Sequence, residues 1–157
     1  MRVKHVMTKD PSCCVPSDGA PRAASIMRDE DTGIVPVIDN EQSQRVVGVV
    51  TDRDLCMNVV AEGRDPRSVT IEACMTTTVV TCSPNDSVEK ATELMKENQI
   101  RRIPVVDEQG RIQGVVSMAD LIHRGDIKAK AAHDTLKEVS APTEEPSKPR
   151  ARSRRVA

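Results

Sequence analysis

Residues 48–54 read Gly-Val-Val-Thr-Asp-Arg-Asp, and residues 114–120 read Gly-Val-Val-Ser-Met-Ala-Asp. Each stretch begins in an apolar run and ends in polar residues, which predicts a strand that leads directly into a helix. A hydroxyl residue, Thr51 or Ser117, stands at the junction, and an aspartate follows three residues later. The recurrence of the string indicates that one structural unit occurs twice.

The repetition extends beyond these strings. Met-Thr occurs at residues 7–8 and again at residues 75–76, a separation of 68 residues, whereas Gly48 and Gly114 are 66 residues apart. The difference of two residues falls in a predicted turn, as expected for a duplication. Two copies form a pair related by a pseudo-two-fold axis, and such a pair can present two equivalent clefts.

The composition excludes several classes of protein. The chain has 157 residues, 30% of them charged, a net charge of −1, and no Phe, Tyr or Trp. A net charge close to zero produces no overall electrostatic attraction for nucleic acid, and the chain has no aromatic side chains on which bases could stack. Nucleic-acid binding is therefore not expected. No apolar run approaches the roughly 20 residues that span a bilayer, so no membrane association is expected either.

Five cysteines, an odd number without a C-x-x-C motif, and an N-terminus without an apolar signal region indicate a cytoplasmic protein with free thiols. The cysteines fit small buried side chains; redox sensing through Cys13 and Cys14 is the alternative. The histidines have no ligand-like spacing with the cysteines, so no metal site is expected.

Each copy is predicted to fold as strand, helix, strand, strand, helix. Asp18 and Asp86 are expected to cap the first helices, the latter in a capping box with Glu89. The β-rich runs are almost continuously apolar and are therefore expected to be buried on both faces. In the second copy, residues 107–110 are expected to form a hairpin loop that ends in a glycine with positive φ. The predicted strands are residues 12–15, 34–38 and 46–50 in the first copy, and 79–82, 103–106 and 112–116 in the second. The predicted first helices are residues 20–28 and 88–98. The final helices are predicted to start at residues 51 and 117, and the second to continue, after a break near Gly125, over residues 128–140.

The fold class is therefore α/β (α+β), with two βαββα units. We expect a first domain with connector over residues 1–66, a second domain over residues 67–140, and a disordered basic tail over residues 141–157. The tail is interpreted as solvated; contact with an anionic partner is the alternative.

The duplicated string can be interpreted in two ways. Backbone N–H groups at a helix N-terminus attract phosphate, the hydroxyl of Thr51 or Ser117 adds a donor, and the carboxylate of Asp54 or Asp120 can accept hydrogen bonds from a ribose diol. The same spacing also matches a capping box, which requires no ligand. A capping box prefers Glu or Gln at the third position, and both copies have Asp.

The chain resembles a tandem pair of CBS (cystathionine-β-synthase) domains, a Bateman module, over roughly residues 1–140. The resemblance is carried by the Met-Thr pairs, the Ile/Val-Pro-Val strands and the two strings above. It implies two clefts for an adenosine compound, either AMP, ADP, ATP or S-adenosylmethionine, with no obligatory cofactor, and a homodimer. It implies ribose contacts from Asp54 and Asp120, and phosphate contacts from Thr51 and Ser117. It also implies an adenine pocket formed by Cys14, Val15, Ile34, Val35, Pro36, Val80, Thr81, Ile103 and Pro104.

Charge distinguishes the two copies. Arg101 and Arg102 stand where the first copy has Gly33 and Ile34, and Arg53 stands where the second has an alanine. The three arginines are further candidates for phosphate contacts, and the cleft of the second copy is expected to prefer more phosphates.

The function expected from the sequence is that of a non-catalytic regulatory or energy-sensing module that signals to an unknown effector protein by a conformational change. The alternative is a ligand-independent dimerisation module, or scaffold, whose interface is formed by residues 52–60 and 118–140. An enzyme is not expected, because the chain shows no phosphate-binding loop and no nucleophile beside a base.

Overall fold

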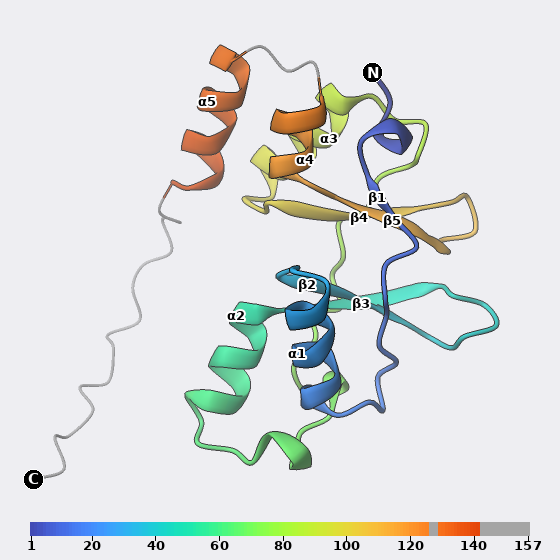
Figure 1. The fold of residues 1–157 in the computed structure, drawn as a ribbon, viewed down its shortest axis with the longest axis vertical. Coiled ribbons are helices and arrows are strands. Elements are labelled where there is room, and N and C mark those ends of the chain that lie inside the picture. Colours follow the sequence, from blue (N-terminus) through green and yellow to red (C-terminus); the bar gives the residue numbers. More distant parts are fainter. Residues whose placement is uncertain (126–128, 142–157) are drawn as a thin grey trace, which may run out of the picture.

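The computed structural model describes residues 1–125 and 129–141. Two antiparallel sheets face each other, and each carries helices on its outer face, so the layers run helix, sheet, sheet, helix (Figure 1). Unit one comprises α1 (Ala20–Asp29), β2 (Ile34–Ile38), β3 (Val46–Thr51) and α2 (Asp52–Leu55), which continues as a π-helical stretch, Cys56–Val60. Unit two comprises α3 (Val88–Glu97), β4 (Arg102–Val106), β5 (Ile112–Ser117) and α4 (Met118–Arg124). A further strand, β1 (Thr8–Lys9), and a further helix, α5 (Ala129–Val139), complete the fold.

The two units repeat each other in detail. In unit one Pro36 pairs with Val49, and in unit two Pro104 pairs with Val115. Both hairpins shift register near their outer ends, and a short parallel bridge adds Cys14 to one sheet and Cys82 to the other. The predicted α/β architecture and strand ranges are therefore confirmed, although the expected strands at residues 12–15 and 79–82 are single bridges.

The two hairpin turns hold the sheets together at one end. The backbone N–H of Val46 donates to the carbonyl of Gly110 at 3.0 Å, and that of Ile112 donates to Gln44 at 3.0 Å. Gln44 and Gly110 have positive φ angles of 53° and 77°, so the turn glycine predicted in the second copy is confirmed. The turns thus cross-link the units at the end of each hairpin.

Each sheet takes one edge from the opposite copy. β1 pairs with β5, with Thr8 opposite Val115, and Thr76 forms the equivalent bridge to Val49. The close approach explains the repeated glycine: a Cβ on Gly114 would lie 2.6 Å from the Thr8 carbonyl oxygen. The glycine therefore admits a neighbouring backbone rather than a ligand.

The hydrophobic cores follow the same exchange. Val3 and Val6 are buried with the side chains of α3, β4, β5 and α4, in the core of unit two. Val69, Ile71 and Cys74 are buried with those of α1, β2 and β3, in the core of unit one. The boundary expected between residues 66 and 67 therefore does not coincide with the division between the cores.

The aspartates expected to cap the first helices lie one residue outside the cap. The N-caps are Gly19 and Ser87, so the predicted capping box with Glu89 is wrong. Asp86 instead accepts a hydrogen bond from the Ser83 N–H at 2.8 Å and pairs with Lys90 at 2.8 Å. Partial burial acts to raise the pKa of Asp86, but these hydrogen bonds outweigh it and lower the pKa. Each aspartate belongs to a Pro-x-Asp turn before the helix, which explains why it lies one residue before the N-cap.

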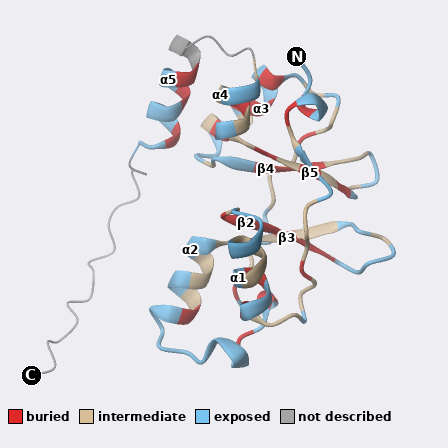
Figure 2. Cartoon of the chain, in the orientation of Figure 1, coloured by how far each residue is buried: buried red, intermediate tan, exposed pale blue. Residues whose placement is uncertain are grey.

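Contrary to the prediction from the apolar runs, the strands are not all buried on both faces. β2 is buried along its whole length, as expected, whereas β3 and β5 alternate between buried and partly exposed residues (Figure 2). These two strands line the clefts described below. α4 ends at Gly125, as predicted, and the expected basic tail lies outside the described residues from position 142 onward.

Of the five cysteines, Cys14, Cys74 and Cys82 are buried and Cys56 is exposed. Burial raises the pKa of the Cys13 and Cys14 thiols to about 11, and that of Cys82 to about 12. Little reactive thiolate forms at such pKa values, which favours buried apolar side chains over redox sensing. None of the helices in residues 1–125 and 129–141 is both long and apolar enough to cross a bilayer.

Candidate functional site

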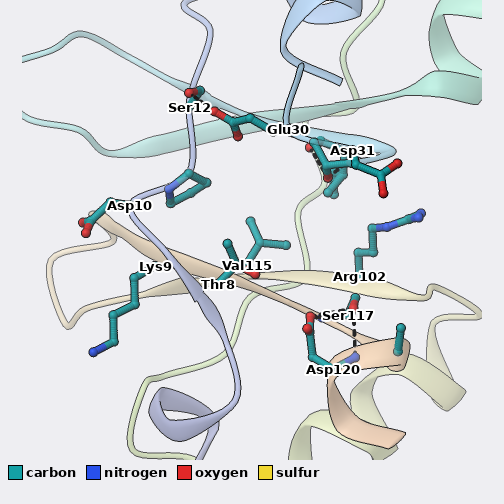
Figure 3. A pocket seen from close by; sticks show the side chains of 14 residues that line it. Thr8, Lys9, Asp10, Ser12, Glu30, Asp31, Arg102, Val115, Ser117 and Asp120 are labelled. Atoms are coloured by element: carbon teal, nitrogen blue, oxygen red, sulfur yellow. Dashed lines mark hydrogen bonds between the residues drawn. The ribbon is translucent and has the colours of Figure 1, made fainter. Parts of the chain in front are cut away.

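Two clefts lie between the units, one at each strand-to-helix junction. The Asp120 cleft has a volume of about 560 Å³, within the usual range of small-molecule sites (Figure 3). Unit two contributes the end of β5 and the start of α4, and the first copy contributes the segment after β1 and the loop before β2. The residues that line this cleft include Lys9, Asp10, Ser12, Glu30, Asp31, Ile34, Arg102, Ser117 and Asp120.

The Asp54 cleft is smaller, about 230 Å³, and less polar in its lining. Unit one contributes the end of β3 and the start of α2, and the second copy contributes the segment after Thr76 and the start of β4. The residues that line this cleft include Ile34, Thr51, Asp54, Thr76, Thr78, Val80, Arg101, Arg102 and Pro104.

Each cleft is therefore composite, with its aspartate from one copy and much of its wall from the other. This follows from the exchanged edges, since β1 lies beside β5 and Thr76 lies beside β3. Arg101 consequently lies with Asp54 and does not line the Asp120 cleft, so it does not support the preference for more phosphates expected of the second copy's cleft. Ile34 and Arg102, which are equivalent in the repeat, line both clefts.

Both junctions form complete capping boxes. The Asp54 N–H donates to Thr51 Oγ1 at 3.1 Å, and the Thr51 N–H donates to Asp54 Oδ2 at 2.9 Å. The Asp120 N–H donates to Ser117 Oγ at 3.1 Å, and Oδ2 of Asp120 accepts from the Ser117 N–H at 2.9 Å. The capping interpretation of the repeated string is therefore confirmed in both copies.

Capping uses only part of each carboxylate. The side-chain carboxylates of Asp54 and Asp120 accept their hydrogen bonds through Oδ2, and Oδ1 of Asp120 forms a long ion pair with Arg124 at 3.9 Å. The two groups line their clefts with Oδ1 still able to accept hydrogen bonds. The cap thus fixes the orientation of a carboxylate that remains available to a ligand.

The remaining predicted residues separate into three groups. Ile34, Val80 and Pro104 line a cleft, as do Arg101 and Arg102. The side chains of Cys14, Val35 and Ile103 are buried in the cores. The third group lies outside both clefts without belonging to the buried cores: Val15, which faces a separate surface hollow, Pro36, Arg53 and Thr81.

Several cleft residues were not predicted from the sequence. Ser12, Glu30 and Asp31 line the Asp120 cleft, and Ser12 donates a hydrogen bond to Glu30. Thr78 lines the Asp54 cleft. The repeat could have indicated some of them. Ser12 is equivalent to Val80, which was predicted to line a pocket, and Asp10 and Thr78 are equivalent residues that line the two clefts. For Glu30 and Asp31, at the end of α1, no motif marked the positions.

The described part of the chain contains no group of three or more His, Cys, Asp and Glu side chains placed to hold a metal ion. What the clefts offer is a pair of oriented carboxylates, hydroxyl groups and a small number of charged side chains. This chemistry suits a ligand with a vicinal diol and a charged substituent.

A family model for the CBS domain matches residues 3–61 and 70–126. The matched residues make up more than half of the chain, which therefore belongs to the CBS domain family and contains two CBS domains in tandem. The resemblance inferred from the repeated motifs is thereby confirmed.

Relatives support the assignment. The chain is 37% identical over 119 residues to the CBS domain-containing protein YhcV of Bacillus subtilis, covering 76% of this chain and 81% of the relative. It is 30% identical over 118 residues to hypoxic response protein 1 of Mycobacterium tuberculosis, covering 75% and 80%.

Two solved structures are also similar. A crystal structure of hypoxic response protein I with two coordinated zinc ions matches with a TM-score of 0.69 at 29% identity, covering 78% of this chain and 97% of that one. The CBS domain pair of protein MJ0100, in complex with 5′-methylthioadenosine and S-adenosyl-L-methionine, matches with a TM-score of 0.71 at 26% identity, covering 79% and 94%. These CBS-pair structures share the fold described above.

Proposed function

We propose that this CBS pair is a non-catalytic regulatory module that binds an adenosine compound, AMP, ADP, ATP or S-adenosylmethionine, in its clefts and signals to an effector protein. The observation that carries the proposal is the duplicated carboxylate, which is held by a cap, lines a cleft and retains an oxygen able to accept from a ribose hydroxyl. The adenosine complexes of the structurally similar MJ0100 pair support it.

Binding in a composite cleft provides a route to signalling. A ligand held by Asp120 would also touch the loop before β2 in the other unit, because both line one cavity. The affinity of the ligand therefore depends on how the two units are packed, and a ligand shifts an equilibrium in proportion to that difference. The change in packing would be the signal that the effector reads.

The first test uses substitutions that keep the cap. Asp54→Gln and Asp120→Gln retain an amide oxygen for the junction N–H, and Gln is favoured at this position of a capping box. The new NH₂ group is a donor and replaces the oxygen that would accept from ribose. Because hydrogen bonds to charged groups contribute about 1.5–3 kcal/mol, we expect each single variant to weaken binding at its own cleft about tenfold or more.

The measurement is calorimetric titration of nucleotide-free protein with AMP, ADP, ATP, NAD and S-adenosylmethionine. We expect saturable binding by the natural protein and loss of that binding in the double Gln variant, with thermal unfolding of the variant unchanged. Absence of binding across the panel by the folded natural protein would show that the junctions are caps only.

A second function, self-association, is favoured by a surface groove on unit one. The groove lies between α1 and the α2 region and is lined by apolar side chains including Ala24, Leu55 and Val60, the last of which is 73% exposed. In unit two the equivalent positions, Thr92 and Leu121, are buried, and α5 packs against α3 there. An uncovered apolar groove of this kind fits the same surface of a second copy.

We therefore expect the natural protein to be a dimer and Val60→Asp to be a monomer, because the substitution places a charge in the apolar contact. Sedimentation velocity across a concentration series gives the masses. Ala61→Asp, at the exposed next position, adds the same charge outside the groove lining and serves as the control. A natural protein that sediments as a monomer throughout, or a Val60→Asp variant that remains a dimer, would remove this interface.

A further inference from the structure

The two clefts carry opposite formal charge although they are equivalent in the repeat. Two cationic and four anionic side chains line the Asp120 cleft: Lys9, Arg102, Asp10, Glu30, Asp31 and Asp120. Two cationic side chains and one anionic side chain line the Asp54 cleft: Arg101, Arg102 and Asp54. The difference arises at positions where the copies diverge, such as Asp10 and Thr78.

The added acidic groups of the Asp120 cleft lie across the opening from Asp120. Figure 3 shows Glu30 and Asp31 on the wall formed by unit one, opposite Ser117 and Asp120 on the wall formed by unit two. Lys9 extends away from Asp31 and Arg102 in this view. A ligand whose ribose lies on Asp120 would therefore direct its remaining group toward Glu30 and Asp31, with Arg102 beside Asp31 as the one cation on that side of the view.

The Asp54 cleft presents the opposite arrangement. Arg101 and Arg102 are both exposed, and neither forms an ion pair with a carboxylate in the described part of the chain. Their guanidinium groups are free to bind phosphate oxygens, for which Arg is well suited. A phosphorylated ligand there would not have to displace an internal partner.

We propose that the two clefts take different ligands: the Asp54 cleft a phosphorylated adenosine compound, and the Asp120 cleft an adenosine compound whose distal group carries positive charge. The inference rests on the proposed function, since it assumes that ribose is held at both aspartates. It assigns to each cleft a class of ligand that the repeat alone cannot distinguish, because the junction motif is the same in both.

A matched pair of probes tests the Asp120 cleft. S-adenosylmethionine carries a sulfonium, an ammonium and a carboxylate group, for a net charge of +1, whereas 5′-methylthioadenosine has the same nucleoside, a neutral sulfur and no amino-acid group. The variant Glu30→Gln/Asp31→Asn removes two charges with little change in shape. Asn also suits residue 31, which has a φ of 49°. We expect the affinity for S-adenosylmethionine to fall about tenfold and that for 5′-methylthioadenosine to stay unchanged.

The Asp54 cleft is tested with ATP and Arg101→Gln, because Arg102 lines both clefts and would not separate them. We expect this variant to bind ATP about tenfold more weakly and S-adenosylmethionine unchanged. The single Gln variants at the two aspartates provide the assignment: ATP binding should be weakened by Asp54→Gln, and S-adenosylmethionine binding by Asp120→Gln.

The outcomes separate this inference from the proposed function. If no adenosine compound binds the natural protein, the proposed function fails. If adenosine compounds bind but Glu30→Gln/Asp31→Asn weakens both probes equally, or if ATP binding with or without Mg²⁺ depends on Asp120, only the division of ligands by charge is overturned.

Discussion

Val3→Asp is expected to destabilise the protein by about 4 kcal/mol, although Val3 precedes every helix and strand of unit two by more than 80 residues. The Val3 side chain has no exposed surface and belongs to the core of unit two, with Met95 and Leu121. Its N–H donates to the carbonyl of Asp86 at 3.0 Å, so the backbone is fixed there as well. A carboxylate at this position would be buried without a partner.

Denaturant unfolding measures the loss. The control is His5→Asp, which introduces the same group two residues away at an exposed position and should change the free energy of unfolding by less than about 0.5 kcal/mol. Equal stability of the two variants would mean that the N-terminal segment does not pack in unit two in solution.

Gly114→Ala is expected to cost about 3 kcal/mol, a large effect for the addition of one methyl group. The new Cβ would lie 2.6 Å from the Thr8 carbonyl oxygen and 2.8 Å from Met7 Sδ. The backbone atom cannot move without breaking the pairing of β1 with β5.

Gly48→Ala provides an internal comparison, because the residue holds the equivalent place in unit one. There the nearest atom is Met75 Sδ at 2.9 Å, the flexible end of a side chain, and the Thr76 oxygen lies at 3.1 Å. We expect this substitution to cost about 1 kcal/mol. Thermal unfolding should show Gly114→Ala to be the less stable variant, and the reverse order would contradict the close approach of β1 to Gly114 in β5.

Much of the fold was predictable because local sequence patterns determine its strands and turns, and each pattern occurs twice. The β-rich runs and the turn at Gly110 follow from hydrophobic runs and turn residues. The caps of α1 and α3 were misplaced by one residue, because Asp18 and Asp86 satisfy turn N–H groups rather than helix N–H groups. Such a choice depends on the geometry of the preceding proline turn, which residue types alone do not fix.

The candidate site was predictable in its motif but not in its composition. The junctions at Thr51 and Ser117 were recognised from spacing, because a capping box is local. The placement of Arg101 in the Asp54 cleft was not, since it depends on which copy supplies the edge of each sheet. Exchange of edges is a long-range property, and a repeat has the same sequence whether its copies pair within themselves or with each other.

The exchanged edges also bear on the origin of the chain. A polypeptide with a single copy would lack the segment that completes its sheet and part of its core, and could obtain both only from a second polypeptide. Fusion converts this encounter between molecules into a contact within one molecule, at an effective concentration set by the connector rather than by expression level. It also frees the two copies to diverge independently, which two identical polypeptides encoded by one gene could not do.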